Sequence, residues 1–369
     1  MQTARRAISL VATVVALLLV ACDEPAPVQI GFIGGLSGRS SDIGEASRNA
    51  VQLAVEQINA RGGINGREVE LLVRDDADDP EVATDAVRDL HQAGVEAIIG
   101  PNLSSIAAAM LPVVNELQVV TISPTASSLV LAGQDDYLFR LNWTTRDNAM
   151  IYAQRYLERG IRRFAVALDA NNRVFSQSWL DEFRSFYEGG GGEIVAVDAF
   201  DAAGARGFAD TVEALLAVSP DGILFIANSV DTAHLTQQVR KQGSDILVVA
   251  AEWAASERLL QLGGRAIEGI ELVQSYNRSD DSARYVAFRD AYRSRFAADP
   301  DFSSLAAHDA ATMLFTALAQ NDEPVPLKQR LIRIGAVQGL QQMVRFDANG
   351  DAQRSAFFVV VRDGTFAPQ

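Results

Sequence analysis

Short runs of β-branched residues alternate along this chain with longer segments of helical period, and this alternation constrains the fold more than any other feature. The first run, 29–33, precedes a helical segment, and the same order repeats as far as 122. Strands that alternate with helices form βαβ units with a parallel sheet. The rhythm restarts at 147, and 369 residues exceed what one hydrophobic core usually fills. The sequence therefore predicts an α/β protein with two doubly wound lobes.

The expected elements follow from hydrophobic periodicity. The strands are 29–33, 69–73, 97–99, 119–122, 164–168, 194–197, 222–226, 246–250 and 269–273. The helices are 44–60, 80–93, 105–117, 147–158, 176–187, 208–217, 232–242, 283–296 and 304–319. A terminal strand pair is expected around 344–346 and 357–361.

The amino terminus is typical of an exported lipoprotein. Two arginines precede an apolar run from 7 to 20, which is too short for a typical membrane-spanning helix. Residues 19–22 resemble a lipobox, in which the cysteine, here Cys22, receives a diacylglyceryl group. We expect a signal peptide at 1–21 and a lipidated polar tether at 22–27. The alternatives are an ordinary signal peptide with a chance cysteine, or an uncleaved anchor.

Charge and motif content exclude several functions. A formal net charge of -15 argues against a nucleic-acid partner, because phosphate backbones bind basic surfaces. Cys22 is the only cysteine, so neither an intramolecular disulfide nor a cysteine-based metal site can form. His91, His234 and His308 fall on separate expected helices, and the acidic loop 75–79 lacks EF-hand spacing. No hydrolase or nucleotide-binding motif occurs. We expect no catalysis, no cofactor and no metal.

Several stretches, in unbroken order between 28 and 361, carry a family resemblance. They are 33–38, 54–80, 99–101, 122–126, 139–147 and 307–310. Together they resemble the type I periplasmic binding proteins, specifically the leucine/isoleucine/valine-binding proteins of branched-chain amino-acid import. The resemblance implies two Rossmann-like lobes joined by three hinge crossovers, with the ligand held in the cleft between them.

The same resemblance implies how the chain divides. The first lobe is expected to contain 28–142 plus 275–336, and the second lobe 143–274 plus 337–369. Because the chain crosses between the lobes more than once, the crossovers are natural hinges, and the lobes are expected to close over the ligand.

Ligand contacts from the first lobe are expected after its third and fourth strands, since ligands favour the carboxyl ends of parallel strands. Ser104 and Ser105 begin a helix whose free N–H groups and hydroxyls can hold a carboxylate. Thr125, Ala126 and Ser127 lie on the loop where the resemblance places partners of the ligand carboxylate and amine. The alternatives are a plain helix N-cap and a capped turn.

Glu252 is the expected contact from the second lobe. It follows strand 246–250, and the resemblance implies that an acid here pairs with a ligand ammonium; the alternative is a solvated helix-capping glutamate. Departures from the family pattern fall where the ligand side chain lies. Phe175 and Asn228 stand at tyrosine positions, and Ile43 replaces an aromatic residue. The amino-acid contacts are thus retained while the side-chain pocket is changed.

The expected function is capture of a small amino acid by hinge closure for an ABC importer. The expected partners are this ligand, the permease subunits and the membrane, through an N-terminal lipid, and the protein is expected to be a monomer. Its expected location is the periplasm or the outer face of the cytoplasmic membrane. Two alternatives stay open: a receptor for an amide or urea-like solute, and a sensory ligand-binding module, which normally carries a spanning helix.

Overall fold

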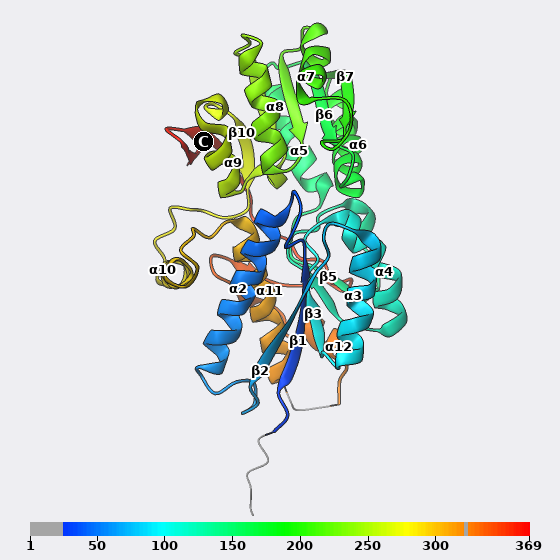
Figure 1. Ribbon diagram of the computed structural model, residues 1–369, viewed down its shortest axis with the longest axis vertical. Helices are drawn as coiled ribbons and strands as arrows, with labels where there is room; N and C mark the ends of the chain where they lie inside the picture. Colours follow the sequence, from blue (N-terminus) through cyan, green and yellow to red (C-terminus); the bar gives the residue numbers. More distant parts are fainter. Residues whose placement is uncertain (1–24, 321–323) are drawn as a thin grey trace, which may run out of the picture.

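The computed structural model describes residues 25–320 and 324–369, which form two α/β lobes around separate sheets. The lobes are stacked along the long axis of the molecule, with β1 to β5 in one and β6 to β10 in the other (Figure 1). Neither described range contains a helix with the length and apolarity needed to cross a membrane. The signal peptide expected at 1–21, and Cys22, lie outside the described residues.

The first lobe is built on a parallel sheet with strand order β2-β1-β3-β4-β5. Helices α2 and α11 cover one face, while α3 and α4 pack together on the other. Because both faces are covered, β1 is buried at every position but Gln29. The bounds are β1 (Val28–Gly34), α2 (Ser41–Asn59), β2 (Val69–Asp75), α3 (Pro80–Ala93), β3 (Ala97–Ile99), α4 (Ser104–Leu117), β4 (Thr121–Ser123) and β5 (Leu138–Arg140).

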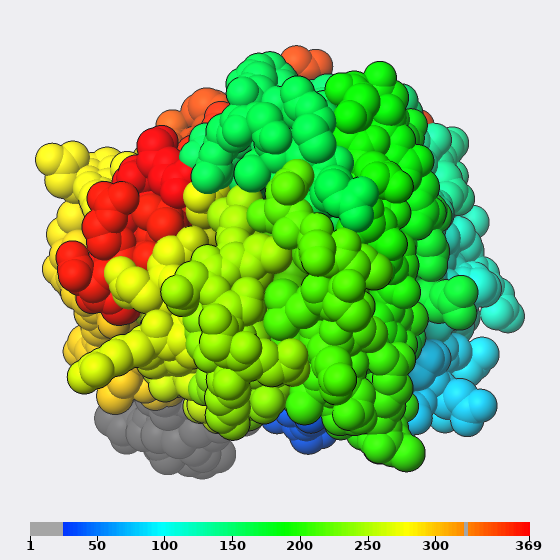
Figure 2. Space-filling view, turned by 90° about the horizontal axis from the view of Figure 1, so that it is seen from above, coloured from blue at the N-terminus to red at the C-terminus, as the bar shows by residue number. Residues whose placement is uncertain are grey.

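The second lobe is built on a sheet with order β14-β13-β10-β9-β8-β6-β7. Its central strands are parallel, and β13 and β14 add an antiparallel edge. Seen end-on, the C-terminal strands lie at the side of this lobe (Figure 2). The bounds are α5 (Thr145–Glu158), β6 (Arg163–Asp169), α6 (Arg173–Gly189), β7 (Glu193–Phe200), α7 (Phe208–Ala217), β8 (Gly222–Ile226), α8 (Ser229–Lys241), β9 (Leu247–Ala250), α9 (Glu257–Gly263), β10 (Glu271–Gln274), β13 (Phe357–Arg362) and β14 (Thr365–Pro368).

The chain returns to the first lobe after β10 and leaves it again before β13. Helices α10 (Ala283–Phe296) and α11 (Phe302–Ala319) pack against α2, and α12 (Leu327–Arg333) packs against α11. The short strands β11 (Val337–Gln338) and β12 (Met343–Val344) follow. Beyond them, Arg354 still pairs with Asp309 of α11, and Ala352 bonds to Arg140 of β5. We therefore propose that the last crossover lies close to 355 rather than at 337.

Helix α3 has the bounds expected from the sequence because capping residues mark both of its ends. Helix α3 begins after Asp79, whose side chain accepts hydrogen bonds from the amides of Glu81 and Val82. It ends at Gly94, which has a φ of 85°, a left-handed conformation that glycine adopts without strain. The expected bounds 80–93 agree with α3 because both ends carry such a signal.

Strands exist near both positions of the expected terminal pair, but they do not pair with each other. Strand β13 pairs with β10 and β14, whereas β12 near 344 pairs with β11. Apolar patterning identifies a strand but not its partner, because pairing is decided by the register that buries one face. Strand β5 was not expected.

Candidate functional site

A cavity between the lobes collects side chains that follow strand ends in both sheets. Ser104, Thr125 and Ser127 follow β3 and β4, while Phe175 lies on α6 and Glu252 follows β9. Open parallel sheets bind ligands at this edge, near the point where strand order reverses, as it does between β1 and β3. The remaining space is about 20 Å³, room for about one water molecule. A larger ligand therefore requires the lobes or side chains to move.

The first lobe contributes hydroxyl groups at the start of α4 and on the loop after β4. Leu103 is the N-cap residue of α4, so Ser104 does not act as the cap. Ser104 Oγ instead accepts hydrogen bonds from the amides of Ser127 and Ser128, each at 3.2 Å. Its own proton is therefore free to point into the cavity. Ser127 Oγ has no hydrogen bond to any described residue. Two hydroxyl donors on one wall suit an oxygen acceptor such as a carboxylate.

Thr125 lines the cavity, but its hydroxyl is satisfied within the protein. Oγ1 donates to the backbone oxygen of Asn102 at 2.8 Å and accepts from Asn102 Nδ2 at 3.1 Å. Asn102 lines the same cavity, and its buried Oδ1 has no hydrogen-bond partner within the described residues. Sequence reasoning missed this acceptor, although its place just beyond β3 was a usable signal.

Glu252 faces the cavity with its carboxylate held by two neutral donors. Asn148 Nδ2 donates to Oε1 at 2.9 Å, and Trp179 Nε1 donates to Oε2 at 3.0 Å. Within the ranges 25–320 and 324–369, Glu252 forms no salt bridge. Burial raises the pKa of Glu252 to about 7, although these hydrogen bonds lower it. The expected alternative, a solvated helix-capping glutamate, does not describe this environment.

The electrostatic consequence is that this wall of the cavity favours a cation. A buried carboxylate is costly unless a positive group or several hydrogen bonds stabilise its charge. Glu252 has the hydrogen bonds but no counter-ion among the described residues. A ligand ammonium can supply that charge, while the serine hydroxyls can hold an acceptor on the opposite side.

Aromatic side chains form the apolar part of the cavity. Phe175 meets Trp253 edge to face, with ring centroids 5.5 Å apart, and Ile43 and Phe302 also line the space. The buried indole Nε1 of Trp253 has no partner in the described part of the chain. The wall therefore accepts an apolar group and can give one further hydrogen bond.

Ser105, Ala126 and Asn228 do not line this cavity. The amide of Ser105 donates to Asn172 Oδ1 at 3.1 Å, which is a contact between the lobes. Ala126 is buried in a small apolar cluster behind the loop. Asn228 caps α8 and exchanges two 2.8 Å hydrogen bonds with Asp231. Direct ligand contact by these three residues stays a prediction, since none of them lines the cavity in this arrangement.

A set of direct contacts, which we call the inter-lobe latch, joins the lobes beside the cavity. Arg39, beyond β1, forms a salt bridge with Asp231 of α8. Asp42 of α2 accepts hydrogen bonds at 2.6 Å from Ser229 and from Ser256. Asn228 positions Asp231 for this pairing. The latch requires the lobes to be together, so it favours the closed arrangement.

Replacing Arg39 by glutamine is expected to shift the unliganded protein toward the open arrangement by about fivefold, a typical value for a partly exposed ion pair. Small-angle scattering should then give a larger radius of gyration. Arg48→Gln, on α2 but outside the latch, is the matched control. Superimposable scattering curves for the two variants would contradict a latch role for Arg39.

The described residues offer no metal site. Among them, no group of three or more histidine, cysteine or acidic side chains is placed to hold a metal ion. His91, His234 and His308 lie on α3, α8 and α11.

The two-lobed fold and the cavity between the lobes define a solute-binding protein. A family model described as periplasmic binding protein matches residues 27–365. The chain therefore belongs to the periplasmic binding protein family. The Leu/Ile/Val-binding protein BraC3 of Rhizobium johnstonii is 24% identical over 261 residues, which is 71% of each chain.

Solved structures share the fold. The branched-chain amino-acid binding protein LivJ of Streptococcus pneumoniae, in complex with isoleucine, aligns with a TM-score of 0.85 and 25% identity, over 92% of this chain and 97% of that one. A solute-binding protein of R. palustris in complex with benzoate aligns with a TM-score of 0.83 and 17% identity, over 93% and 95%. Proteins of this fold therefore bind both amino acids and aromatic acids.

Proposed function

We propose that this protein captures a small apolar amino acid in the inter-lobe cavity and delivers it to the permease subunits of an ABC importer. The observation that carries the proposal is the carboxylate of Glu252, held by Asn148 and Trp179 without a counter-ion among the described residues. An α-ammonium matches this group. Relatives that bind branched-chain amino acids support the same ligand class.

The proposed arrangement of the ligand follows from the donors and acceptors around the cavity. The ammonium lies between Glu252 and the free Oδ1 of Asn102. The carboxylate accepts hydrogen bonds from Ser104 and Ser127. The side chain packs on the Phe175 wall, which favours aliphatic groups over charged ones. Closure of the lobes about their crossovers buries the ligand.

A screen of amino acids against the protein tests the proposal. Thermal melting and calorimetry with each common amino acid should identify an apolar one that raises the melting temperature and binds with saturable heat. Arginine, lysine and glutamate should have little effect, because their side-chain charges have no partner on the apolar wall. A screen in which no amino acid binds, while another solute class does, would overturn the amino-acid assignment.

An aromatic acid without an ammonium is the second candidate. The benzoate complex of a structural relative and the aromatic wall here favour it. Such a ligand would bind best with Glu252 protonated, which its pKa of about 7 permits. Benzoate in the same screen separates the candidates when its binding is compared between the parent and Ser104→Ala/Ser127→Ala, because only binding in this cavity is lost in the variant. An amide or urea-like solute carries neither an ammonium nor a carboxylate. If only such a solute binds, the protein is a receptor for amide or urea-like solutes instead.

We also propose that the protein is held at the outer face of the cytoplasmic membrane by lipid on Cys22. The apolar run from 7 to 20 and the lipobox-like residues 19–22 support export and lipidation. A tethered receptor stays close to a permease in the same membrane. A sensory role would instead need a signalling partner, which a co-purification with and without ligand would reveal.

Replacing Cys22 by serine is expected to abolish lipid attachment, because the thiol is the acceptor of the diacylglyceryl group. Cells fed radiolabelled fatty acid should label the parent protein and leave the variant unlabelled, and the variant should shift from the membrane to the soluble fraction. Ser127→Ala, which leaves the lipobox intact, is the control. Equal labelling of parent and Cys22→Ser would disprove the anchor.

A further inference from the structure

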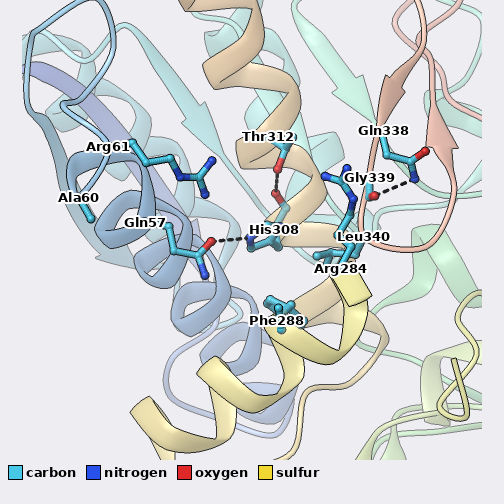
Figure 3. A pocket seen from close by; sticks show the side chains of 11 residues that line it. Gln57, Ala60, Arg61, Arg284, Phe288, His308, Thr312, Gln338, Gly339 and Leu340 are labelled. Atoms are coloured by element: carbon cyan, nitrogen blue, oxygen red, sulfur yellow. Dashed lines mark hydrogen bonds between the residues drawn. The ribbon is translucent and has the colours of Figure 1, made fainter. Parts of the chain in front are cut away.

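A second hollow lies on the first lobe, away from the inter-lobe cavity. It has a volume of about 440 Å³, within the range of small-molecule sites. Gln57 of α2 and Arg61, in the turn just after α2, surround it together with Arg284 and Phe288 of α10 and His308 of α11 (Figure 3). A neighbouring hollow of about 370 Å³ is lined by four of the same residues, so the two form one groove; they are Gln57, Arg61, His308 and Thr312.

The two arginines of this groove have no acidic partner in the described part of the chain. Neither the Arg61 nor the Arg284 side chain forms a salt bridge or a hydrogen bond there, although the protein carries a net charge of -15. Asp309, which follows His308 on α11, is already paired with Arg354 and accepts the amide of Leu340 at 2.8 Å. The groove therefore presents two positive groups that this acid does not neutralise.

His308 contributes a polar but uncharged surface between the arginines. Its Nε2 lies 3.4 Å from Gln57 Oε1, and its ring packs edge-on against Phe288 with centroids 4.9 Å apart. Its buried Nδ1 has no hydrogen-bond partner among the residues described. Burial lowers the pKa of His308 to about 4, with smaller lowering effects of the Arg61 and Arg284 charges and an opposing effect of Asp309 included in that value. The positive charge of the groove at neutral pH thus comes from the arginines.

We propose that this groove is a second small-molecule site, which binds an organic anion with its carboxylate at Arg61 and Arg284 and its apolar body against Phe288 and Leu340. Guanidinium groups bind carboxylates through charge-assisted, often bidentate hydrogen bonds. The aromatic ring and the leucine supply apolar contact next to them. Gln57 and Thr312 also line the groove and can bind a further polar group of the ligand.

The experiment uses 4-fluorobenzoate as the probe and detects its binding by line broadening in fluorine NMR spectra. The uncharged 4-fluorobenzyl alcohol is measured in parallel as a control for the carboxylate. Removing both charges in Arg61→Gln/Arg284→Gln is expected to weaken 4-fluorobenzoate binding by about tenfold or more. The alcohol should bind weakly to every form. Arg48→Gln/Arg289→Gln removes one arginine from α2 and one from α10, both outside the groove, and should bind the acid as the parent does.

The inter-lobe cavity needs a separate control, because it is also a candidate site for aromatic acids. Ser104→Ala/Ser127→Ala alters that cavity alone, so 4-fluorobenzoate binding in the groove should persist in it. If binding is instead lost in this variant and kept in Arg61→Gln/Arg284→Gln, the probe occupies the cavity and the second site is disproved. Absence of binding to the parent at about 10 mM, a concentration that detects even weak sites, would also overturn the proposal. Neither result decides whether an amino acid binds the inter-lobe cavity, which the amino-acid screen tests separately.

Discussion

Glu252→Gln is expected to weaken binding of a zwitterionic amino acid by tens to thousands of fold, which corresponds to about 2 to 5 kcal/mol. The glutamine removes the charge that pairs with the ligand ammonium while keeping the size of the side chain. The ammonium is then left partly unpaired in a cavity from which water is largely excluded. Calorimetric titration of both proteins with the amino acid identified by the screen measures the difference.

Two controls separate this contact from a general effect on the fold. The unliganded stability should change by no more than about 1 kcal/mol, because the glutamine loses one acceptor toward Asn148 or Trp179 but no longer buries a charge. A ligand analogue without the ammonium should bind both proteins similarly. Equal affinity of both proteins for the amino acid would mean that Glu252 does not contact an ammonium.

The pH dependence of binding provides an independent readout of the same contact. The pKa of Glu252 is about 7 in the unliganded protein, so the carboxyl is increasingly protonated below that pH. Because the ammonium needs the carboxylate, affinity should fall as pH decreases from 7, by up to about tenfold per unit. Glu252→Gln should show a flat profile. The folded state raises this pKa, so protonation favours folding, and this group adds stability as pH falls from about 7 toward 4.5.

Asp309→Asn is expected to destabilise the protein by about 3 to 5 kcal/mol, because it leaves the buried guanidinium of Arg354 without its counter-ion. The Arg354 and Asp309 side chains are only 4% and 2% exposed. Arg354 also donates to the backbone oxygen of Leu141 at 3.0 Å, so the pair joins α11, the first crossover and the returning chain. Urea unfolding followed by circular dichroism measures the effect.

A double variant tests whether the unpaired charge is the cause. In Asp309→Asn/Arg354→Met the guanidinium is gone, so the double variant should be more stable than Asp309→Asn alone. Lys328→Met removes the partner of an exposed acid, Asp135, and should change stability by less than about 1 kcal/mol. An Asp309→Asn protein as stable as the parent would show that the pair does not hold the last crossover in place.

The resemblance at 307–310 illustrates what sequence comparison conveys and what it omits. It correctly indicated the family, yet two of its residues have different environments: Asp309 forms the buried pair, while His308 borders the second groove. Both lie on α11, and neighbouring residues on a helix point in different directions. The surroundings of each residue are formed by α2, α10 and the chain near 340. The sequence around 307–310 does not reveal where those distant segments lie.

The sequence by itself determined the element types, the two α/β lobes and the family, because burial of parallel strands and helix faces leaves a periodic pattern in the chain. This pattern was enough to predict helices α7 and α10 and strand β8, whose bounds agree with those expected. Only the tertiary structure decided which polar groups meet at the cavity. Glu252 receives one of its two side-chain hydrogen bonds from Asn148, 104 residues earlier. Such pairings, like the pairing of β13 with β10, arise from packing between distant segments.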